Sequence, residues 1–300
     1  VHVRDLRVVF RRDGQTINAV NGVSFDVQKG EVMALIGESG SGKSVTLRAL
    51  MRLHPPGSSE LSGTLRVGDD AVLTMSASQL RRYRGGRCAM IFQEPLLAFD
   101  PVYTVGQQII EGLRRHEGLS RQAARDRALE ALRQVRIPSP ERRLDAYPHE
   151  MSGGMRQRAM IALALSCNPQ LLLADEPTTA LDATVQIQIL ILLREQQKQR
   201  GLSIVFVTHD IGAAVEIADR VLVLQRGEVV EDGRPDVLIR GGGRYADQLG
   251  GRHRVGAPDS VGRLHCVARR QHQRPRAQRA ARDQCACRAA TPGPHADRHR

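Results

Sequence analysis

Residues 37–44 read Gly-Glu-Ser-Gly-Ser-Gly-Lys-Ser and have the residue types of a phosphate cradle. Their spacing fits the pattern G-x-x-x-x-G-K-[ST], and they lie between a short apolar run, residues 31–36, and a helix-forming run, residues 45–52. Glycines let the backbone curl so that successive N–H groups and the positive end of the following helix surround an anion. The segment therefore predicts a site for the phosphates of a nucleotide.

Each polar group of this loop has an expected task. Lys43 would contact the β- and γ-phosphates of ATP, and Ser44 would ligate Mg²⁺. The other phosphate contacts would come from the backbone between residues 37 and 45, namely Gly37, Ser39, Gly40, Ser41, Gly42, Lys43, Ser44 and Val45. A glycine-rich turn that binds nothing is the alternative, and the strand and helix that flank the loop disfavour it.

A second segment, residues 171–176, is an apolar run that ends in two acids, Asp175 and Glu176. A strand buried on both faces tolerates carboxylates only at its mouth, where a metal and a nucleotide can pair with them. Asp175 would hold Mg²⁺ through water, and Glu176 would polarise the attacking water. An acid pair without function would be the better interpretation of this segment alone. Combined with the phosphate cradle, it predicts a P-loop NTPase that uses ATP and Mg²⁺.

A third segment has no lysine and yet resembles an anion site. Ser152, Gly153 and Gly154 precede a helix-forming run, residues 155–165, so a hydroxyl and two glycine amides would lie at a helix N-terminus. The run Met151-Ser-Gly-Gly-Met155 resembles the ABC signature, which is usually written LSGGQ. The resemblance implies that this segment contacts the γ-phosphate bound to the opposite subunit. Met151 and Met155 depart from the pattern but leave the hydroxyl and the amides in place.

The same resemblance implies roles for four more residues in the expected order along the chain. Gln93 matches the Q-loop glutamine, which touches Mg²⁺ and the attacking water. Asp182 matches the D-loop that crosses the dimer interface, and His209 matches the switch histidine that bonds the γ-phosphate. Phe10 is the candidate for stacking on adenine, and Ile17 or Val20 could lie there instead. Gln93, His209 and Glu176 together form the expected catalytic group.

Longer segments resemble one branch of the family, the ATPase subunits of dipeptide and oligopeptide importers. They are residues 88–95, 100–106, 147–158 and 178–186, and the likeness covers about residues 1–245. It implies a second ATPase subunit (identical or not), two membrane permease subunits and an extracytoplasmic solute-binding protein. It also implies a peripheral location on the cytoplasmic face of the membrane. Close relatives carry nickel or glutathione. An ABC exporter or lipid-extraction ATPase, or a soluble ABC ATPase of DNA repair or translation, remains the alternative.

The order of the apolar patterns predicts the fold. Residues 1–10 and 19–27 alternate apolar and polar side chains, as antiparallel strands do. Residues 100–150 have helical periodicity, and strand-like and helix-like runs alternate beyond them, which predicts a parallel sheet with helices on its faces. We expect an α/β ABC cassette over residues 1–250, with a mostly parallel core sheet, an antiparallel N-terminal β subdomain and an inserted α-helical subdomain at about residues 100–155.

The charge is concentrated in the last fifty residues. Residues 251–300 contain 12 arginines against 3 acids, whereas residues 1–250 contain 32 basic residues against 29 acids. A nearly neutral body argues against a nucleic-acid partner despite the net charge of +12.

We expect residues 251–300 to be disordered or aberrant, since they have few large aliphatic side chains. Cys266, Cys285 and Cys287 fall short of the four thiols of an iron–sulfur site. No apolar run is long enough to span a bilayer.

Overall fold

The computed structural model describes residues 1–12, 15–179 and 181–240. The predictions for residues 251–300, for Ala180 and for most of the turn at residues 12–14 lie outside these residues. The chain divides into two units, residues 1–246 and 247–300, and the fold given below is that of the first unit.

The centre of the fold is a six-stranded sheet with the strand order β10-β9-β3-β8-β7-β6. Every neighbouring pair is parallel except β9 and β10, which are antiparallel. All residues of β3, β6, β7 and β8 are buried, which explains their uninterrupted apolar sequences. The predicted mostly parallel core sheet is confirmed. Its strands are β3 (Val32–Ile36), β6 (Cys88–Ile91), β7 (Leu171–Asp175), β8 (Ser203–Val207), β9 (Arg220–Gln225) and β10 (Glu228–Gly233).

A second, antiparallel sheet has the strand order β2-β1-β4-β5. Its strands are β1 (His2–Arg12), β2 (Gln15–Asp26), β4 (Ser59–Val67) and β5 (Asp70–Ala71). The pairing of β1 with β2 confirms the predicted N-terminal strands. No strand was predicted for β4, because most of its side chains are exposed and few are apolar. Its backbone pairs with β1, and only Leu65 and Val67 at its end are buried in the core.

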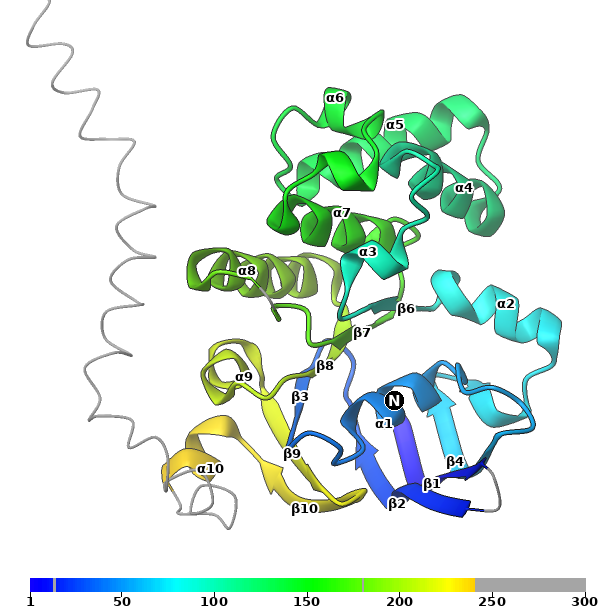
Figure 1. Cartoon of the computed structure of the whole chain (residues 1–300), viewed down its shortest axis with the longest axis vertical. Helices are drawn as coiled ribbons and strands as arrows, with labels where there is room; N and C mark the ends of the chain where they lie inside the picture. Colours follow the sequence, from blue (N-terminus) through cyan, green and yellow to red (C-terminus); the bar gives the residue numbers. More distant parts are fainter. Residues whose placement is uncertain (13–14, 180, 241–300) are drawn as a thin grey trace, which may run out of the picture. The chain divides into compact units, whose positions relative to one another are not determined.

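The inserted helices form a group of their own, which Figure 1 shows in green and teal, apart from the blue strands of the antiparallel sheet. They are α3 (Pro95–Ala98), α4 (Val105–Glu117), α5 (Arg121–Gln134), α6 (Pro140–Leu144) and α7 (Gly153–Leu165), with a 3₁₀ turn at Pro148–Glu150. Thr104 and Ser120 cap α4 and α5 by accepting a bond from a backbone N–H in the first turn. The predicted helical insertion is confirmed.

The remaining helices are α1 (Lys43–Leu50), α2 (Ala77–Gly86), α8 (Ala183–Arg200), α9 (Ile211–Ile217) and α10 (Pro235–Arg240), with a 3₁₀ turn at Val72–Thr74. Helix α1 begins two residues earlier than the sequence pattern predicts, with Gly42 at its N-cap, and ends two residues earlier, with Met51 at its C-cap. Within the described part of the chain, no helix has the length and apolarity needed to cross a bilayer.

The parallel strands place the predicted site residues at one edge of the core sheet. Residues 37–42 follow β3, Gln93 follows β6, Glu176 follows β7, and His209 follows β8. These four strands are neighbours in the sheet, and the carboxyl ends of parallel strands point the same way. Segments far apart in the sequence therefore meet where open α/β sheets bind their ligands.

Candidate nucleotide site

The loop between β3 and α1 requires glycine at two positions. Gly37 has φ 152° and Gly42 has φ 99°. A Cβ at Gly37 would lie 2.2 Å from the Leu224 carbonyl oxygen, and a Cβ at Gly42 would lie 2.6 Å from that of Ala19. Gly40 is different, since no atom lies within 4 Å of the place its Cβ would take. The loop is thus packed against the sheet on one side and open at Gly40, as a cradle for an anion must be.

Lys43 is buried with its ammonium inside the loop. Its Nζ donates to the carbonyl oxygens of Gly37 and Glu38, both at 2.8 Å, and the residue is 6% exposed. Burial lowers the pKa of Lys43, while the carboxylates of Glu176 and Asp175 oppose that shift. A buried cation with two carbonyl acceptors and, among the described residues, no direct anionic partner fits a phosphate group. The amide of Ser41, in contrast, already donates to Glu38 within the loop.

Ser44 and Asp175 meet as the sequence predicts. The Ser44 hydroxyl donates to Asp175 Oδ1 at 2.7 Å, and Arg48 Nη2 lies 3.7 Å from Asp175 Oδ2. Burial raises the pKa of Asp175, and the bond from Ser44 and the charge of Arg48 oppose this shift. Hydroxyl and carboxylate oxygens are ligands that Mg²⁺ prefers, so the side chains of Ser44 and Asp175 fit that ion. Arg48 had no predicted role.

Glu176 is the point at which the other predicted residues converge. Its φ is 47°, an uncommon conformation for a residue with a side chain, and its amide donates to the Val207 carbonyl oxygen at 3.1 Å. The Oε2 atom accepts from Gln93 Nε2 at 3.4 Å and lies 3.4 Å from His209 Nδ1. The loops after three strands thus bring Gln93, His209 and Glu176 together.

Sequence reasoning missed a further partner of Glu176. The Thr179 hydroxyl donates to Glu176 Oε2 at 2.8 Å, the shortest contact that this oxygen makes with another side chain. Thr179 lies three residues after the glutamate, and its amide also donates to the Glu176 carbonyl oxygen at 3.2 Å. A threonine that follows a strand-end acid by one turn was the available signal. The turn fixes the carboxylate in its strained position.

Next to these carboxylates is a cavity of about 350 Å³. Its lining comprises Arg48, Phe92, Gln93, Glu94 and Ala98. Arg48 and Gln93 connect it to Asp175 and Glu176 respectively. The cavity therefore borders Gln93, one of the residues predicted to act on water.

Phe10 and Ile17 lie opposite each other in the β1–β2 ladder, so two of the three candidates for adenine stacking occupy one face of the hairpin. Phe10 is half-buried and packs edge-on against His54, with ring centroids 5.3 Å apart. His54 in turn lies 2.9 Å from the Val45 carbonyl oxygen in the first turn of α1. Val20 is 1% exposed in the core and has no free face to offer. The Phe10 assignment stays a prediction.

Ser152 caps α7, because its Oγ accepts from the Met155 amide at 3.4 Å. Gly153 and Gly154 are the first helical residues. Asp182 caps α8 in the same way through the Val185 amide, at 3.0 Å. A Cβ at Gly154 would lie 2.9 Å from Val185 Cγ1, so the predicted signature and D-loop segments are packed side by side.

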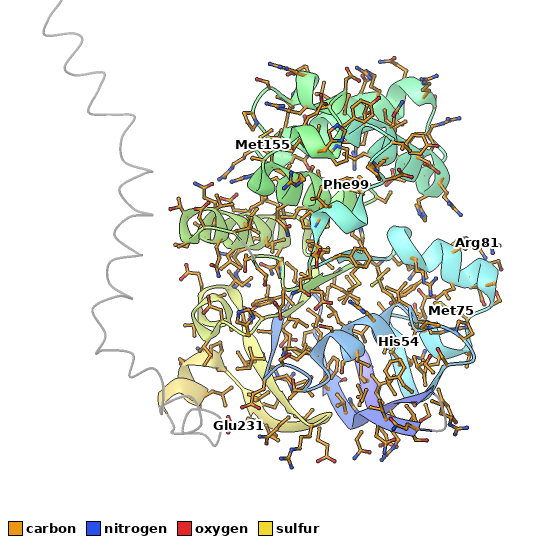
Figure 2. The ribbon with its side chains drawn as sticks, viewed as in Figure 1. His54, Met75, Arg81, Phe99, Met155 and Glu231 are labelled. Carbon is orange, nitrogen blue, oxygen red and sulfur yellow. The ribbon has the colours of Figure 1, made fainter. Side chains whose placement is uncertain are left out.

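These caps lie away from the phosphate loop of the same chain. Figure 2 shows Met155 with the helical group and His54 beside α1, in different parts of the molecule. No hydrogen bond or ion pair between described residues joins residues 152–154 to residues 37–45. Within one chain, the predicted site is therefore in two separate halves.

The packing of Gly154 against Val185 gives a stability prediction. Gly154→Ala should destabilise the fold by about 1–3 kcal/mol, because the added methyl must displace Val185. Gly153→Ala is the matched control, since its methyl would lie 3.8 Å from Leu181 and should change stability by less than about 0.5 kcal/mol. Urea denaturation measures both, and equal unfolding curves would show that the close contact is absent.

A family model described as ABC transporter matches residues 20–179, which include the phosphate loop, Gln93, the Ser152 cap and the strand-end carboxylates. The chain belongs to the ABC transporter family. ATP binding and hydrolysis are accordingly the chemistry of this cassette, as the phosphate loop and the carboxylate pair indicate.

Several relatives are similar over most of this chain. A peptide import ATP-binding protein of Brucella abortus (strain 2308) is 50% identical over 239 residues, 80% of this chain and 72% of that protein. The oligopeptide transport ATP-binding protein OppD of Bacillus subtilis (strain 168) is 48% identical over 241 residues, 80% of this chain and 67% of that protein. The glutathione import ATP-binding protein GsiA of Shigella sonnei is 50% identical over 248 residues, which make up 39% of the length of that protein.

Solved structures agree with the observed fold. A dimeric ATP-binding cassette in a post-hydrolysis state, bound to ADP and Pi, superposes with a TM-score of 0.69 and 28% identity. The match covers 78% of this chain and 98% of that one. The cassette cbiO1 of Clostridium perfringens, part of the transporter complex cbiONQ, gives a TM-score of 0.65, with 26% identity, over 83% of this chain and 96% of that chain. The predicted ABC cassette fold is therefore confirmed.

Proposed function

We propose that this chain is the ATP-hydrolysing subunit that powers import of di- and oligopeptides through an ABC transporter. The similarity to relatives named for peptide and oligopeptide import, at 50% and 48% identity over 80% of the chain, supports the substrate class. The observation that carries the mechanism is the division of the site: the phosphate loop and carboxylates form one half, and the Ser152 cap forms the other.

Hydrolysis would proceed at the first half with the residues already in contact. Lys43 and the open loop amides hold the β- and γ-phosphates, and Ser44, Asp175 and Gln93 would hold Mg²⁺, whose charge stabilises the phosphate oxygens. Glu176 Oε2 accepts the proton of the attacking water. Thr179 fixes that oxygen, and Gln93 and His209 lie close enough to orient the water and bond the γ-phosphate.

The second half would come from a second subunit. The free amides at the N-terminus of α7 and the Ser152 hydroxyl attract an anion, yet they lie apart from the loop of their own chain. A head-to-tail pair places the Ser152 cap of each protomer against the γ-phosphate bound to the other, with Asp182 at the interface. ATP closes the pair, and loss of the γ-phosphate that both protomers grip opens it. The dimeric relative with ADP and Pi supports this arrangement.

Import requires further subunits. We infer two membrane permease subunits, which the helical group and the Gln93 loop would contact, and an extracytoplasmic solute-binding protein that delivers the peptide. The chain would then be peripheral, on the cytoplasmic face of the membrane. The same arrangement would suit a second ATPase subunit of different sequence.

Reconstitution tests the substrate class. The chain would be placed in proteoliposomes with the permease and binding-protein subunits that copurify with it, and ATP-driven uptake of a labelled dipeptide and of labelled glutathione would be compared. Uptake of the dipeptide that stops with Glu176→Gln is the expected result. An assembly that hydrolyses ATP and moves neither compound, or that extrudes them, would remove peptide import while leaving the ATPase assignment intact.

A further inference from the structure

A second cavity lies between α2 and α4, outside the nucleotide site. It has a volume of about 280 Å³ and is lined by Ser78, Arg81, Arg82, Arg115 and His116. The first three residues belong to α2 and the last two to the C-terminal turn of α4, and the two helices pack against each other. Figure 2 shows Arg81 on α2 at the edge of the molecule. Basic side chains from two helices thus converge on one hollow, and none of the lining residues is a carboxylate.

The three arginines differ from most other described arginines in having no partner. Arg125, Arg136 and Arg194, for example, pair with carboxylates at distances of 2.6–3.0 Å. Arg81, Arg82 and Arg115 make no ion pair and no side-chain hydrogen bond with any residue that the structure describes. Because like charges repel at short range, their convergence is unfavourable unless an anion lies between them.

The walls of the cavity are held in place by contacts on their far sides. In α2, the Tyr83 hydroxyl donates to the Leu50 carbonyl oxygen at 2.9 Å, and Arg84 Nε donates to that of Met51 at 2.9 Å. Helix α2 kinks at Gly85, where φ is 86°, and a Cβ there would lie 2.7 Å from His116 Nε2. The imidazole of α4 therefore rests on the kink of α2, and the two helices that carry the basic groups are held in place before any ligand arrives.

We propose that this cavity binds a phosphate group, either free inorganic phosphate or the phosphate of an anionic lipid headgroup. The planar guanidinium groups present parallel N–H donors that match two oxygens of a phosphate, and the Ser78 hydroxyl and His116 add further donors. The volume of about 280 Å³ is large enough for a phosphate group or a headgroup. The proposal concerns binding at this cavity and stands independently of the peptide import proposed above.

Such a ligand would act on the nucleotide site through the chain itself. Helix α2 is bonded to α1 and continues directly into β6, which ends just before Gln93 and its bond to Glu176. Helix α4 belongs to the inserted helical group. A phosphate held by Arg81 and Arg115 ties these two parts together and so sets the position of the Gln93 loop relative to the helices.

Calorimetric titration with inorganic phosphate tests the first source. The full chain would be used with its nucleotide site filled by saturating AMP-PNP and Mg²⁺, so that the phosphate loop cannot take up the probe. Replacing Arg81 and Arg115 together by Gln should weaken phosphate binding at least about ten-fold, since two charge-assisted contacts are lost. Arg114 and Arg121, both replaced by Gln, form the matched control, because they are exposed, carry the same charge and do not line the cavity.

Flotation with vesicles tests the second source. Vesicles of phosphatidylglycerol are compared with vesicles of phosphatidylcholine, using the same two double variants. Binding of free phosphate that depends on Arg81 and Arg115 assigns the site to a soluble ligand, and dependence seen with phosphatidylglycerol alone assigns it to a headgroup. The proposal is overturned if neither probe binds, or if the control pair weakens binding as much as the cavity pair.

Discussion

Replacing Glu176 by Gln is expected to slow ATP hydrolysis by about 10²–10⁴-fold while leaving ATP binding intact. The amide keeps the size of the side chain and can still accept the bond from Thr179, but it cannot take a proton from water. Because the γ-phosphate is then not removed, the ATP-bound dimer should accumulate. Single-turnover hydrolysis and size-exclusion chromatography with ATP measure the two effects.

The control for this variant is Glu216→Gln, an exposed glutamate on α9 away from the carboxylate cluster. It should hydrolyse ATP at the wild-type rate and show no added dimer. Turnover by the Glu176 variant at the rate of this control would remove Glu176 from the role of base. The acceptor of the water proton would then have to be sought among other groups near the cleft.

Replacing Lys43 by Ala should weaken ATP binding by about 10²-fold or more, since it removes charged donors to two phosphates. The effect can be followed through stability, because a ligand at a hundred times its Kd stabilises the folded state by about 2.7 kcal/mol. For a chain of this size, that corresponds to a rise in Tm of roughly 5–10 °C. The wild-type protein should show this rise with Mg²⁺ and ATP, and the Lys43 variant should not.

Lys198 supplies the matched comparison, since it is an exposed lysine in the last turn of α8. Lys198→Ala should keep the full rise in Tm. If the Lys43 variant kept it as well, the loop would bind nucleotide without its buried ammonium. The proposal that Lys43 Nζ, which donates to two loop carbonyl oxygens, binds a phosphate would then be wrong.

The resemblance to the ABC family implied that Gln93, Glu176 and His209 act together, and the structure explains why they meet. Each follows a buried strand of the core sheet, and parallel strands end at a common edge. The contacts of Thr179 and Arg48 were not predicted in the same way. The contact of Thr179 depends on the strained turn at Glu176, for which a threonine three residues after the acid was the one sequence signal. The contact of Arg48 depends on the orientation of one face of α1, which leaves no pattern in residue types.

The same limit explains why the sequence did not predict the cavity between α2 and α4. Arg81 and Arg115 are 34 residues apart on separate helices, and each alone looks like an ordinary exposed arginine. The packing of His116 on the Gly85 kink brings them together. A glycine in a helical sequence pattern does not predict which side chain will pack against it. Tertiary contacts of this kind have to be read from the structure.

In the proposed dimer, the phosphate loop of one protomer and the Ser152 cap of the other contact the same nucleotide. Site-directed cross-linking tests it most directly, with Ser39→Cys in one copy and Ser152→Cys in the other, both carrying Glu176→Gln. We expect a cross-linked pair when the two variants are mixed with Mg²⁺ and ATP, and none with ADP. A dimer that forms with ATP but yields no such cross-link, or yields it equally without nucleotide, would contradict this arrangement.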